Sequence, residues 1–557
     1  MVQAAVRTFD YDITYVDNVK ADGLKERRVI GVNGKWPPPP IEAWVNDTIV
    51  INVKNSLDVI TGLHSHGMFQ NGTAWMDGAV GTTQCGIPPG QTYTYRYNAT
   101  QHGTYWFHSH FMGQYVDGLR GPLIIHPAQE AYQYDEDYTI AISDWYFQEY
   151  QEIMKWFFDL YNPTGIEPSP DSGTLLVLRN ASYVDAKQLS FTPGKTYRIR
   201  FINMSAFAMF HVGISGHDME IIEVDGVDVN RTKSQGFDMT IAQRYSVLVR
   251  ARNDTSTNFN IHADMDISVF SPLMDTLQYN MTVPIIYNSS APSTTEVPAW
   301  DTTDDLTLSP LVVEASIEPD VTHEITASMG VMTDGLPRAQ FNDVTFIQPQ
   351  VPSILTALTT GADANNSAVY GKQTNALVMP HNKMIQLVIN NNDGGPHPFH
   401  LHGHVFQILN RSDTFYDANV PLPSNPNPVR RDTVLIPPNG SVVLQYRADN
   451  PGAWLFHCHI QWHMDQGLIM LFIEAPEVLQ QRLGGQVPSY LTDQCKILGK
   501  PVEGNAIGKA GLDLKGEPEG PYMLPDGFTT KGKIGLAGTI VCALLGLSTV
   551  WWFGKSA

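Results

Sequence analysis

The segment "WLFHCHIQWHMDQGL", from Trp454 to Leu468, holds three histidines and one of the four cysteines in this chain of 557 residues. Its first half has the aromatic and aliphatic composition of a strand. Side chains that are adjacent along a strand point to opposite faces. Cys458 would therefore face away from His457 and His459, so that one strand carries a thiol on one face and two imidazoles on the other.

Four His-x-His pairs lie near the two ends of the chain: His64 and His66, His108 and His110, His400 and His402, and His457 and His459. Residues two apart on a strand share a face at roughly 6.5–7 Å, so each pair can hold neighbouring metal ions. A single pair is more often two surface imidazoles. Four pairs favour eight convergent imidazoles, provided that the two ends of the chain meet.

The thiol of Cys458 can join His397, from "GPHPFH", and His463 in a site of two histidines and one cysteine. Thiolate with imidazole selects copper, and this ligand set is the blue-copper arrangement. At the axial position, ten residues after the cysteine, stands Leu468, which cannot coordinate. We therefore expect a three-coordinate copper with a raised potential, and we expect Met464 to serve packing.

Short alternating runs such as "TIVINVKN", "QTYTYRYN" and "TYRIRFIN" predict an all-β fold of antiparallel sandwiches. Residues 48–67 resemble residues 384–403, and residues 103–110 resemble 452–459, which indicates a duplicated module. We predict three sandwich domains at 1–127, 128–295 and 296–500, of which the middle one lacks the paired histidines. One surface helix is expected near residues 144–161.

Residues 534–554 contain no charged side chain and would span roughly 31 Å as a helix, about the thickness of a bilayer core. We predict a single transmembrane helix here, with Trp551 and Trp552 at the interface. A buried core helix, the alternative, is seldom so uniformly apolar. Residues 501–533 are rich in Gly, Lys and Pro and are expected to form a stalk.

Twelve Asn-x-Ser/Thr sequons precede the apolar segment and predict an exported, N-glycosylated ectodomain. They are Asn46, Asn71, Asn98, Asn180, Asn203, Asn230, Asn253, Asn280, Asn288, Asn365, Asn410 and Asn439. We expect a signal peptide and a cytosolic tail beyond the given sequence. In an exported ectodomain, Cys85 and Cys495 can form a disulfide. Cys542 lies in the apolar segment, so Cys458 is the cysteine that remains free.

The formal net charge of -21 argues against a nucleic-acid partner, because binding to phosphates requires a basic patch. An acidic surface instead concentrates small cations near the protein.

Together, "LHSHG", "YWFHSH", "HPFHLHGH" and "HCHIQWHMDQGL" resemble the multicopper oxidases over residues 10–495. The resemblance implies three cupredoxin-like domains and four copper ions, with a trinuclear cluster between the first and third domains that reduces dioxygen to water. It assigns His397, Cys458 and His463 to the type 1 copper and His64 and His400 to the type 2 copper. The type 3 pair would take His66, His108, His110, His402, His457 and His459.

Two side chains bear on the protons that oxygen reduction consumes. Asp77, in "AWMDG", matches the family's acidic residue near the cluster. Gln461 stands where related ferroxidases usually carry Glu, and an amide can relay a hydrogen bond but cannot donate a proton as an acid.

Carboxylates near the type 1 histidines distinguish iron from other reductants, because Fe(II) prefers oxygen ligands. Asp393 lies four residues before His397, and Glu167, in "YNPTGIEPSP", matches the carboxylate of fungal cell-surface ferroxidases. Arg338 stands where those enzymes tend to carry Tyr, and its positive charge would repel Fe(II). His404 and His381 are expected to be ordinary core or surface residues.

The layout of ectodomain, stalk and single span resembles that of fungal iron-uptake ferroxidases, and this resemblance implies a single-pass plasma-membrane ferroxidase with an extracellular N-terminal part, which oxidises Fe(II) with dioxygen beside an iron permease in high-affinity iron uptake. The alternatives are a laccase-like oxidase of phenols or pigment precursors and a copper-binding surface protein without turnover. Assays with Fe(II) and a diphenol would separate all three.

Overall fold

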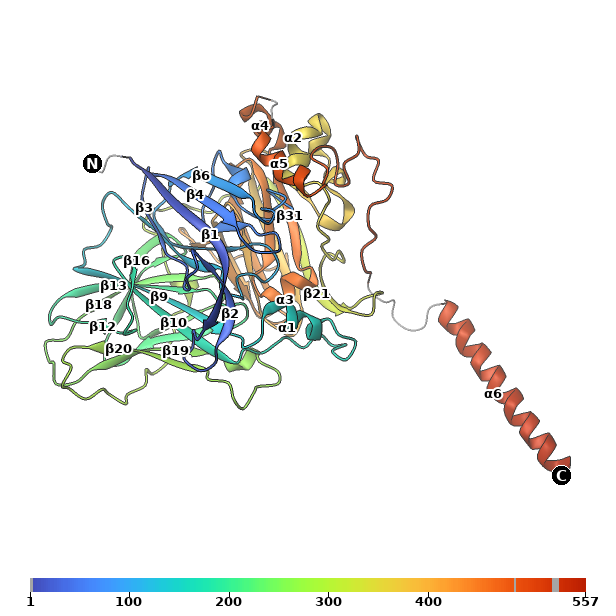
Figure 1. Cartoon of the computed structure of the whole chain (residues 1–557), viewed down its shortest axis with the longest axis horizontal. Helices are drawn as coiled ribbons and strands as arrows, with labels where there is room; N and C mark the ends of the chain where they lie inside the picture. The colour runs from blue at the N-terminus through green and yellow to red at the C-terminus, as the bar shows by residue number, and fades with distance from the viewer. Residues whose placement is uncertain (1–3, 485–486, 523–529, 557) are drawn as a thin grey trace.

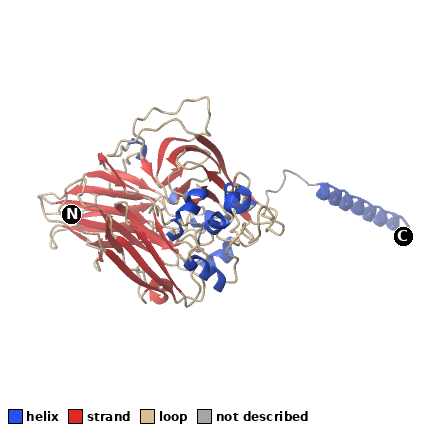
Figure 2. Ribbon diagram, turned by 90° about the horizontal axis from the view of Figure 1, so that it is seen from above, coloured by secondary structure: helices blue, strands red, loops and turns tan. Residues whose placement is uncertain are grey.

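The computed structural model describes residues 4–484, 487–522 and 530–556. Six β-sheets pair into three sandwiches, and a separate helix lies at the C-terminal end (Figure 1). Figure 2 shows the strands in red forming most of the body, with short helices gathered on one side. The predicted all-β fold with one C-terminal apolar helix is confirmed.

The first sandwich packs the sheet β2-β1-β4-β6 against the sheet β3-β8-β7-β5. In β6, Tyr93, Tyr95 and Tyr97 are buried while the residues between them are exposed, so the alternation seen in "TYTYRYN" does face one core. The strands are β1 (Val6–Val19), β2 (Arg27–Val32), β3 (Ile41–Trp44), β4 (Thr48–Asn55), β5 (Leu63–His66), β6 (Thr92–Asn98), β7 (Gly103–Ser109) and β8 (Arg120–His126).

The second sandwich has a seven-stranded sheet, β11-β10-β9-β13-β18-β15-β16, and a five-stranded sheet, β12-β20-β19-β14-β17. Its strands are β9 (Glu136–Trp145), β10 (Ser172–Arg179), β11 (Ser182–Tyr183), β12 (Leu189–Ser190), β13 (Thr196–Asn203), β14 (Phe210–Ile214), β15 (Met219–Val224), β16 (Val227–Ser234), β17 (Gly236–Met239), β18 (Arg244–Arg250), β19 (Phe259–Met265) and β20 (Asn280–Ile286).

The third sandwich pairs the sheet β22-β21-β24-β29-β26-β27 with the sheet β23-β31-β30-β25-β28. Its strands are β21 (Val321–Val331), β22 (Pro337–Phe341), β23 (Leu377–Met379), β24 (Met384–Asn392), β25 (His397–Leu401), β26 (Phe406–Ser412), β27 (Arg430–Arg431), β28 (Thr433–Ile436), β29 (Ser441–Arg447), β30 (Gly452–Cys458) and β31 (Ile469–Glu474).

Equivalent strand pairs carry the histidines in the first and third sandwiches. His64 of β5 is the antiparallel partner of His108 in β7, and His400 of β25 is the partner of His457 in β30. The internal similarity of the sequence therefore corresponds to one repeated pairing, which presents two histidine pairs on each side of the interface.

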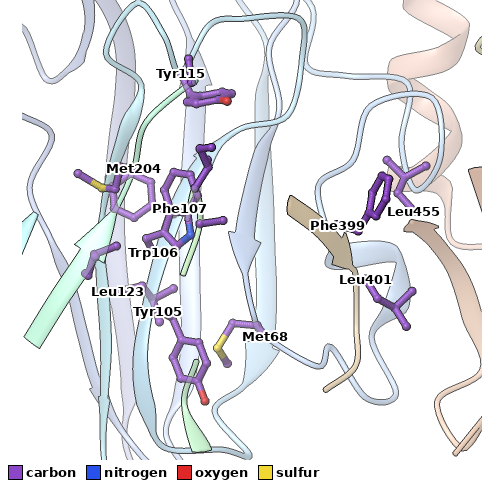
Figure 3. Close-up of a cluster of buried hydrophobic side chains, with 14 of the residues drawn as sticks. Met68, Tyr105, Trp106, Phe107, Tyr115, Leu123, Met204, Phe399, Leu401 and Leu455 are labelled. Atoms are coloured by element: carbon purple, nitrogen blue, oxygen red, sulfur yellow. The ribbon is translucent and has the colours of Figure 1, made fainter. Parts of the chain in front are cut away.

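Apolar side chains of the first and third sandwiches belong to one continuous core. Trp106 and Phe107 of β7 contribute from one side, and Phe399 and Leu401 of β25 with Leu455 of β30 contribute from the other (Figure 3). This packing brings the two histidine-bearing strand pairs together.

Buried charged side chains connect the middle sandwich to both of its neighbours, through a hydrogen bond to the first sandwich and an ion pair to the third. Glu223 accepts a hydrogen bond from the backbone nitrogen of Thr104 in the first sandwich at 2.6 Å, and its charge is paired with Arg198 within the middle sandwich. Arg244 binds Asp432 of the third sandwich with both Nη atoms, at 2.9 and 2.6 Å. Because an unpaired buried charge is costly, these pairs specify how the three units fit together.

The helices depart from the sequence-based expectation. The helix expected near 144–161 is shorter, because β9 continues to Trp145 in pairing with β10 and only α1 (Tyr150–Phe157) is helical. The other helices are α2 (Ser353–Thr359), α3 (Gln461–Gln466), α4 (Pro476–Arg482) and α5 (Ser489–Ile497), with short 3-10 helices η1 (Ala74–Met76), η2 (Ile267–Val269), η3 (Asp305–Thr307), η4 (Gly361–Asn365), η5 (Ser367–Tyr370) and η6 (Lys372–Thr374). Each of α2 to α5 is too short to have an evident period in the sequence.

The first part of the expected stalk lies against the third sandwich instead of leaving it. The backbone nitrogen of Ala506 donates to Val369 at 2.7 Å, and its oxygen accepts from Gln350 at 2.8 Å. The side chain of Asn505 is fully buried and holds this turn through Gly511 and Asp513. The stalk expectation is therefore wrong for residues 501–522, and residues 523–529 lie outside the described part of the chain.

The apolar segment forms α6 (Thr530–Ser556), which includes the predicted residues 534–554. It is long and apolar enough to cross a membrane, and the body of the protein buries none of it. The predicted disulfide between Cys85 and Cys495 is present and joins the first sandwich to α5 across 410 residues of sequence.

Candidate metal centre

Three sequence segments bring the thiol and its two imidazoles together. Cys458 is the last residue of β30, His397 is the first residue of β25, and His463 lies in α3. Gly467, with a φ of 103°, ends α3 and turns the chain back, so that Leu468 accepts a hydrogen bond from the Cys458 nitrogen at 3.1 Å. The buried Leu468 thus lies beside the cysteine backbone.

The Sγ atom of Cys458 lies 3.6 Å from Nδ1 of His397 and 3.5 Å from Nδ1 of His463. All three side chains are buried. Burial raises the pKa of the Cys458 thiol, but the two imidazoles outweigh it and lower the pKa to about 7. A thiolate with two converging ring nitrogens fits a copper ion, because soft sulfur and imidazole are the ligands that copper prefers.

Two carboxylates contact the two histidines of this site from the solvent side. Oε1 of Glu167 is 3.0 Å from Nε2 of His463, and Oδ2 of Asp393 is 3.2 Å from Nε2 of His397. Both carboxylate side chains are 28% exposed. Burial raises their pKa values, but the hydrogen bonds from the histidines outweigh it, lowering the pKa of Glu167 and bringing that of Asp393 to about 2.

The local sequence "YNPTGIEP" explains how Glu167 reaches this place. The buried Asn162 side chain donates to the backbone oxygens of Phe157 and Ile166 and accepts from the Ile166 nitrogen, which closes the loop after α1. Gly165 has a φ of 69°, and a Cβ there would lie 2.6 Å from Pro337, so the position requires glycine. The loop is therefore held against the third sandwich with its carboxylate at His463.

The eight paired histidines are all buried and converge between the first and third sandwiches. The shortest centroid separations, 3.8 Å between His66 and His400 and 4.1 Å between His64 and His402, show that the eight rings form one continuous cluster, within which two triplets can be described. His110, His402 and His457 lie 5.0–5.3 Å apart, whereas the second triplet is wider at 5.2–5.9 Å and consists of His66, His108 and His459. The remaining pair, His64 and His400, has centroids 6.2 Å apart.

Unpartnered ring nitrogens provide a test of whether these residues fit metal ions. Several buried ring nitrogens have no hydrogen-bond partner among the described residues. They are Nε2 of His64, His108, His110 and His400 and both ring nitrogens of His459. Leaving a buried polar atom unpaired costs about 1–3 kcal/mol, so several in one cavity require an explanation. Burial also lowers the pKa of His108, His457 and His459, which keeps these rings neutral as metal ligation requires. The cluster fits copper ions held by imidazole.

Asp77 lies at the cluster as expected. Its Oδ2 is 2.9 Å from Nδ1 of His402 and its Oδ1 is 3.2 Å from Nδ1 of His64. Burial raises its pKa, but the attraction of the two imidazoles outweighs burial, and the pKa falls well below the usual range. Asp77 therefore stays ionised and fixes the orientation of both rings.

Sequence reasoning missed a second buried carboxylate, Asp432. Its Oδ1 is 3.3 Å from Nε2 of His66, and its backbone oxygen accepts from Nδ1 of His400 at 2.8 Å. Arg244 of the middle sandwich holds the same carboxylate. The only signal in the sequence was a charged pair, "RD", at the start of a strand, which is not specific for this role.

Gln461 lies between the cluster strand and a third carboxyl group. Its side-chain amide donates to Oδ1 of Asp465 at 3.0 Å, while its backbone nitrogen donates to Ala206. Burial raises the pKa of Asp465 to about 7. Gln461 therefore has an acidic neighbour one hydrogen bond away.

Arg338 has an acidic partner of its own. Its guanidinium group pairs with Asp334 at 3.1 Å and packs over the ring of Phe158 at 4.9 Å. Asp334 thus neutralises part of the positive charge of Arg338, which was expected to repel Fe(II). His404, expected to be ordinary, is buried and its Nε2 pairs with Glu474 at 2.9 Å.

Three models of one family, described as multicopper oxidase, match residues 13–130, 136–282 and 346–478. A relative from Mycosarcoma maydis, named iron multicopper oxidase fer1, is 44% identical over 98% of this chain and 92% of its own length. Among solved structures, Fet3p, described as a multicopper oxidase that functions in iron import, superposes with a TM-score of 0.85 at 36% identity, covering 91% of this chain and 97% of that one. A laccase from Botrytis aclada superposes with a TM-score of 0.78 at 28% identity, covering 89% and 92%.

Proposed function

The chain belongs to the multicopper oxidase family, and from that premise we propose that it is a ferroxidase, which oxidises Fe(II) to Fe(III) and reduces dioxygen to water. The observation that carries the proposal is the pair of half-buried carboxylates, Glu167 and Asp393, each bonded to the outer nitrogen of a histidine whose inner nitrogen faces Cys458. The names of the iron-related relatives support the same assignment.

In this proposal the chain holds four copper ions. His397, Cys458 and His463 bind the type 1 ion, with Leu468 as a noncoordinating neighbour, and His64 and His400 bind the type 2 ion. The type 3 ions take His66, His108 and His459, and His110, His402 and His457. When bound, the copper ions accept electrons one at a time from the reductant and deliver four to dioxygen.

The protein's own side chains supply the rest of the chemistry. Glu167 and Asp393 bind Fe(II) as substrate, and because carboxylates bind Fe(III) more tightly than Fe(II), they favour its oxidation. Their lowered pKa values keep both ionised at neutral pH. Asp77 holds the rings of His64 and His402 in place. Because it contacts both rings, we assign it as the acidic residue beside the copper cluster.

We further propose that the protein is a single-pass plasma-membrane protein with an extracellular, N-glycosylated body that works beside an iron permease. The apolar helix α6 supports the anchor. Ten of the twelve sequon asparagines are exposed and Asn410 is partly exposed, whereas Asn203 is buried. The domain limits 1–127, 128–295 and 296–500 belong to the same proposal, and they fall between the strands of successive sandwiches.

One observation favours a second candidate function, the oxidation of phenols. A cavity of about 480 Å³ lies between the second and third sandwiches, and its lining includes Gly394 and Pro396, next to Asp393, together with Met209, Phe210 and Leu435. Charged residues, among them Asp238, Asp305 and Arg411, also line it, and a cavity of this size with partly apolar walls can receive a small aromatic molecule. The similarity to a laccase structure agrees with this alternative.

Steady-state oxygen consumption by the purified full-length holoenzyme tests the proposal, with Fe(II) and a diphenol as separate reductants. We expect a higher kcat/KM for Fe(II). A preference for the diphenol would support the laccase-like function instead, and no oxygen uptake with either reductant would leave only copper binding.

A further inference from the structure

The C-terminal segment leaves the body at one defined turn. Tyr522 is the last described residue before α6, and it is held by Thr333, in the turn between β21 and β22. The Thr333 nitrogen donates to the Tyr522 oxygen at 2.8 Å, and the Tyr522 nitrogen donates to Oγ1 of Thr333 at 3.1 Å. Figure 1 shows this segment following the outer side of the third sandwich down to β21. The tether to α6 therefore starts at this turn.

β22, the strand that follows this turn, contacts residues 146–171, the insertion between β9 and β10 that contains α1 and Glu167. Arg338 of β22 packs over Phe158 at 4.9 Å, and Pro337 lies against Gly165. In Figure 1, α1 lies close to α3 and β21 on this side of the body. The start of the tether and the proposed iron site are thus neighbours, although they are far apart in the sequence.

The same insertion exposes three large apolar side chains. Trp156 of α1 is 49% exposed, Leu160 is 74% exposed and Tyr161 is 96% exposed. The opposite side of α1 is buried, because Ile153 and Phe157 belong to the core. Trp and Tyr are the residues that concentrate at the interface between a bilayer and water. Trp156, Leu160 and Tyr161, called the tip below, thus present apolar surface to solvent.

The length of the tether sets how far the tip is from the membrane. Residues 523–529 separate Tyr522 from Thr530, the first residue of α6. A fully extended chain gains at most about 3.6 Å per residue, so this link spans less than about 30 Å. With α6 in a bilayer, the turn at Thr333 therefore lies within about that distance of the first residue of α6, and the tip belongs to the segment that packs on β22 beside this turn.

We propose that Trp156, Leu160 and Tyr161 form a second membrane contact, which inserts shallowly into the interfacial zone of the bilayer that holds α6. The occupant is lipid, because the tether brings the tip to the bilayer even without a partner. The exposed Glu152–Lys155 pair on the same helix has no net charge, and the exposed carboxylate of Asp159, which accepts a hydrogen bond from the Tyr161 nitrogen, would stay at the level of the zwitterionic headgroups. This inference rests on the proposed anchor. Its consequence is that the side of the body that carries Glu167 faces the membrane.

A fluorescent probe on the full-length holoenzyme tests this contact. The variant Tyr161→Cys, in a Cys542→Ser background that removes the exposed thiol, carries an environment-sensitive nitrobenzoxadiazole label, while Cys458 is buried and protected. The protein is reconstituted into phosphatidylcholine vesicles with and without doxyl-labelled lipid. The matched control is Val313→Cys, whose parent side chain is 73% exposed. Leu311 beside it bonds to Asp228 of β16, on the side of the body away from α6 in Figure 1.

We expect the emission at position 161 to shift to the blue in vesicles and to be quenched by doxyl lipid, while the control remains aqueous. Adding Trp156→Ser and Leu160→Ser should abolish both effects without lowering Fe(II) oxidation in detergent. Vesicle flotation reports the anchor separately. Flotation with an aqueous probe at 161 would overturn the contact alone, and so would a shift that appears only when a second membrane protein is added. Failure to float would overturn the anchor and, with it, this inference.

Discussion

Oε1 of Glu167 lies 3.0 Å from Nε2 of His463, and the other ring nitrogen of that histidine lies 3.5 Å from Sγ of Cys458. A carboxylate from the middle sandwich, about a quarter exposed, is therefore one imidazole away from a fully buried sulfur. Asp393 and His397 repeat the arrangement from within the third sandwich. In the proposed function, Fe(II) is thus held by a carboxylate at the surface, while the site at Cys458 stays closed to solvent.

Replacing Glu167 with Gln should reduce kcat/KM for Fe(II) by about 10- to 150-fold. The amide keeps the size of the side chain but loses the charge, and a charged hydrogen bond contributes about 1.5–3 kcal/mol. Oxidation of a diphenol, which needs no carboxylate, should change little. Stopped-flow and steady-state kinetics with both reductants measure the difference. Glu152→Gln, on the exposed face of α1, is the matched control, and equal losses for both reductants would contradict the iron-binding role.

Replacing Cys458 with Ser should remove one copper ion per chain and leave the others. A serine hydroxyl is a poor ligand for copper compared with thiolate, whereas the imidazoles of the cluster lie on the opposite face of β30. Copper per chain by elemental analysis and the loss of the blue absorption band give the measurement. Loss of all copper would show that the two sites do not assemble independently.

Replacing Arg244 with Gln should lower the free energy of unfolding by about 3–5 kcal/mol, because it leaves the buried carboxylate of Asp432 without its partner. The exposed pair of Arg28 and Glu149 supplies the control, since Arg28→Gln should cost no more than about 1 kcal/mol. Calorimetric unfolding of the copper-free proteins measures both. Because Asp432 also contacts His66, we expect the Arg244 variant to bind copper less completely.

Glu223 should make the free energy of unfolding depend on pH in the acid range. Burial raises its pKa, but the guanidinium groups of Arg198 and Arg200 outweigh burial and bring the pKa from 4.5 to about 2. A lowered folded-state pKa means that the stabilisation is complete above about pH 4.5 and disappears as the pH falls towards 2, amounting to about 3 kcal/mol. Denaturation midpoints between pH 6 and 3 measure it. In Glu223→Gln this part of the acid dependence should be missing, and an unchanged profile would contradict the assignment.

The sequon at Asn203 should carry no glycan. Its side chain is buried and donates to the backbone oxygens of Ala208 and Met239, so a sugar there would break the core. Exposed sequons such as Asn71 and Asn439 remain available. Deglycosylation in heavy-oxygen water followed by peptide mass spectrometry locates the occupied sites. A glycan found at Asn203 in folded, active protein would contradict the position of this strand.

Local spacing was sufficient to predict much of the candidate site. His457, Cys458 and His459 alternate across one strand, and that period alone separated the thiol from the imidazoles. The duplicated motifs indicated that two strand pairs would face each other. Helix lengths were predicted less well, because α2, α4 and α5 are only one to three turns long and have no sequence period that distinguishes them from loops.

The sequence by itself determined the fold class, the candidate ligands, the disulfide partners and the apolar C-terminal helix, since each follows from periodicity or from a residue type with specific chemistry. Only the tertiary structure revealed Asp432 and its partner Arg244, the burial of Asn203, and the packing of residues 501–522 on the third sandwich. It also placed the start of the tether beside the loop of Glu167. These features depend on contacts between residues far apart in the sequence, and such contacts are set by how whole sandwiches pack rather than by any local pattern.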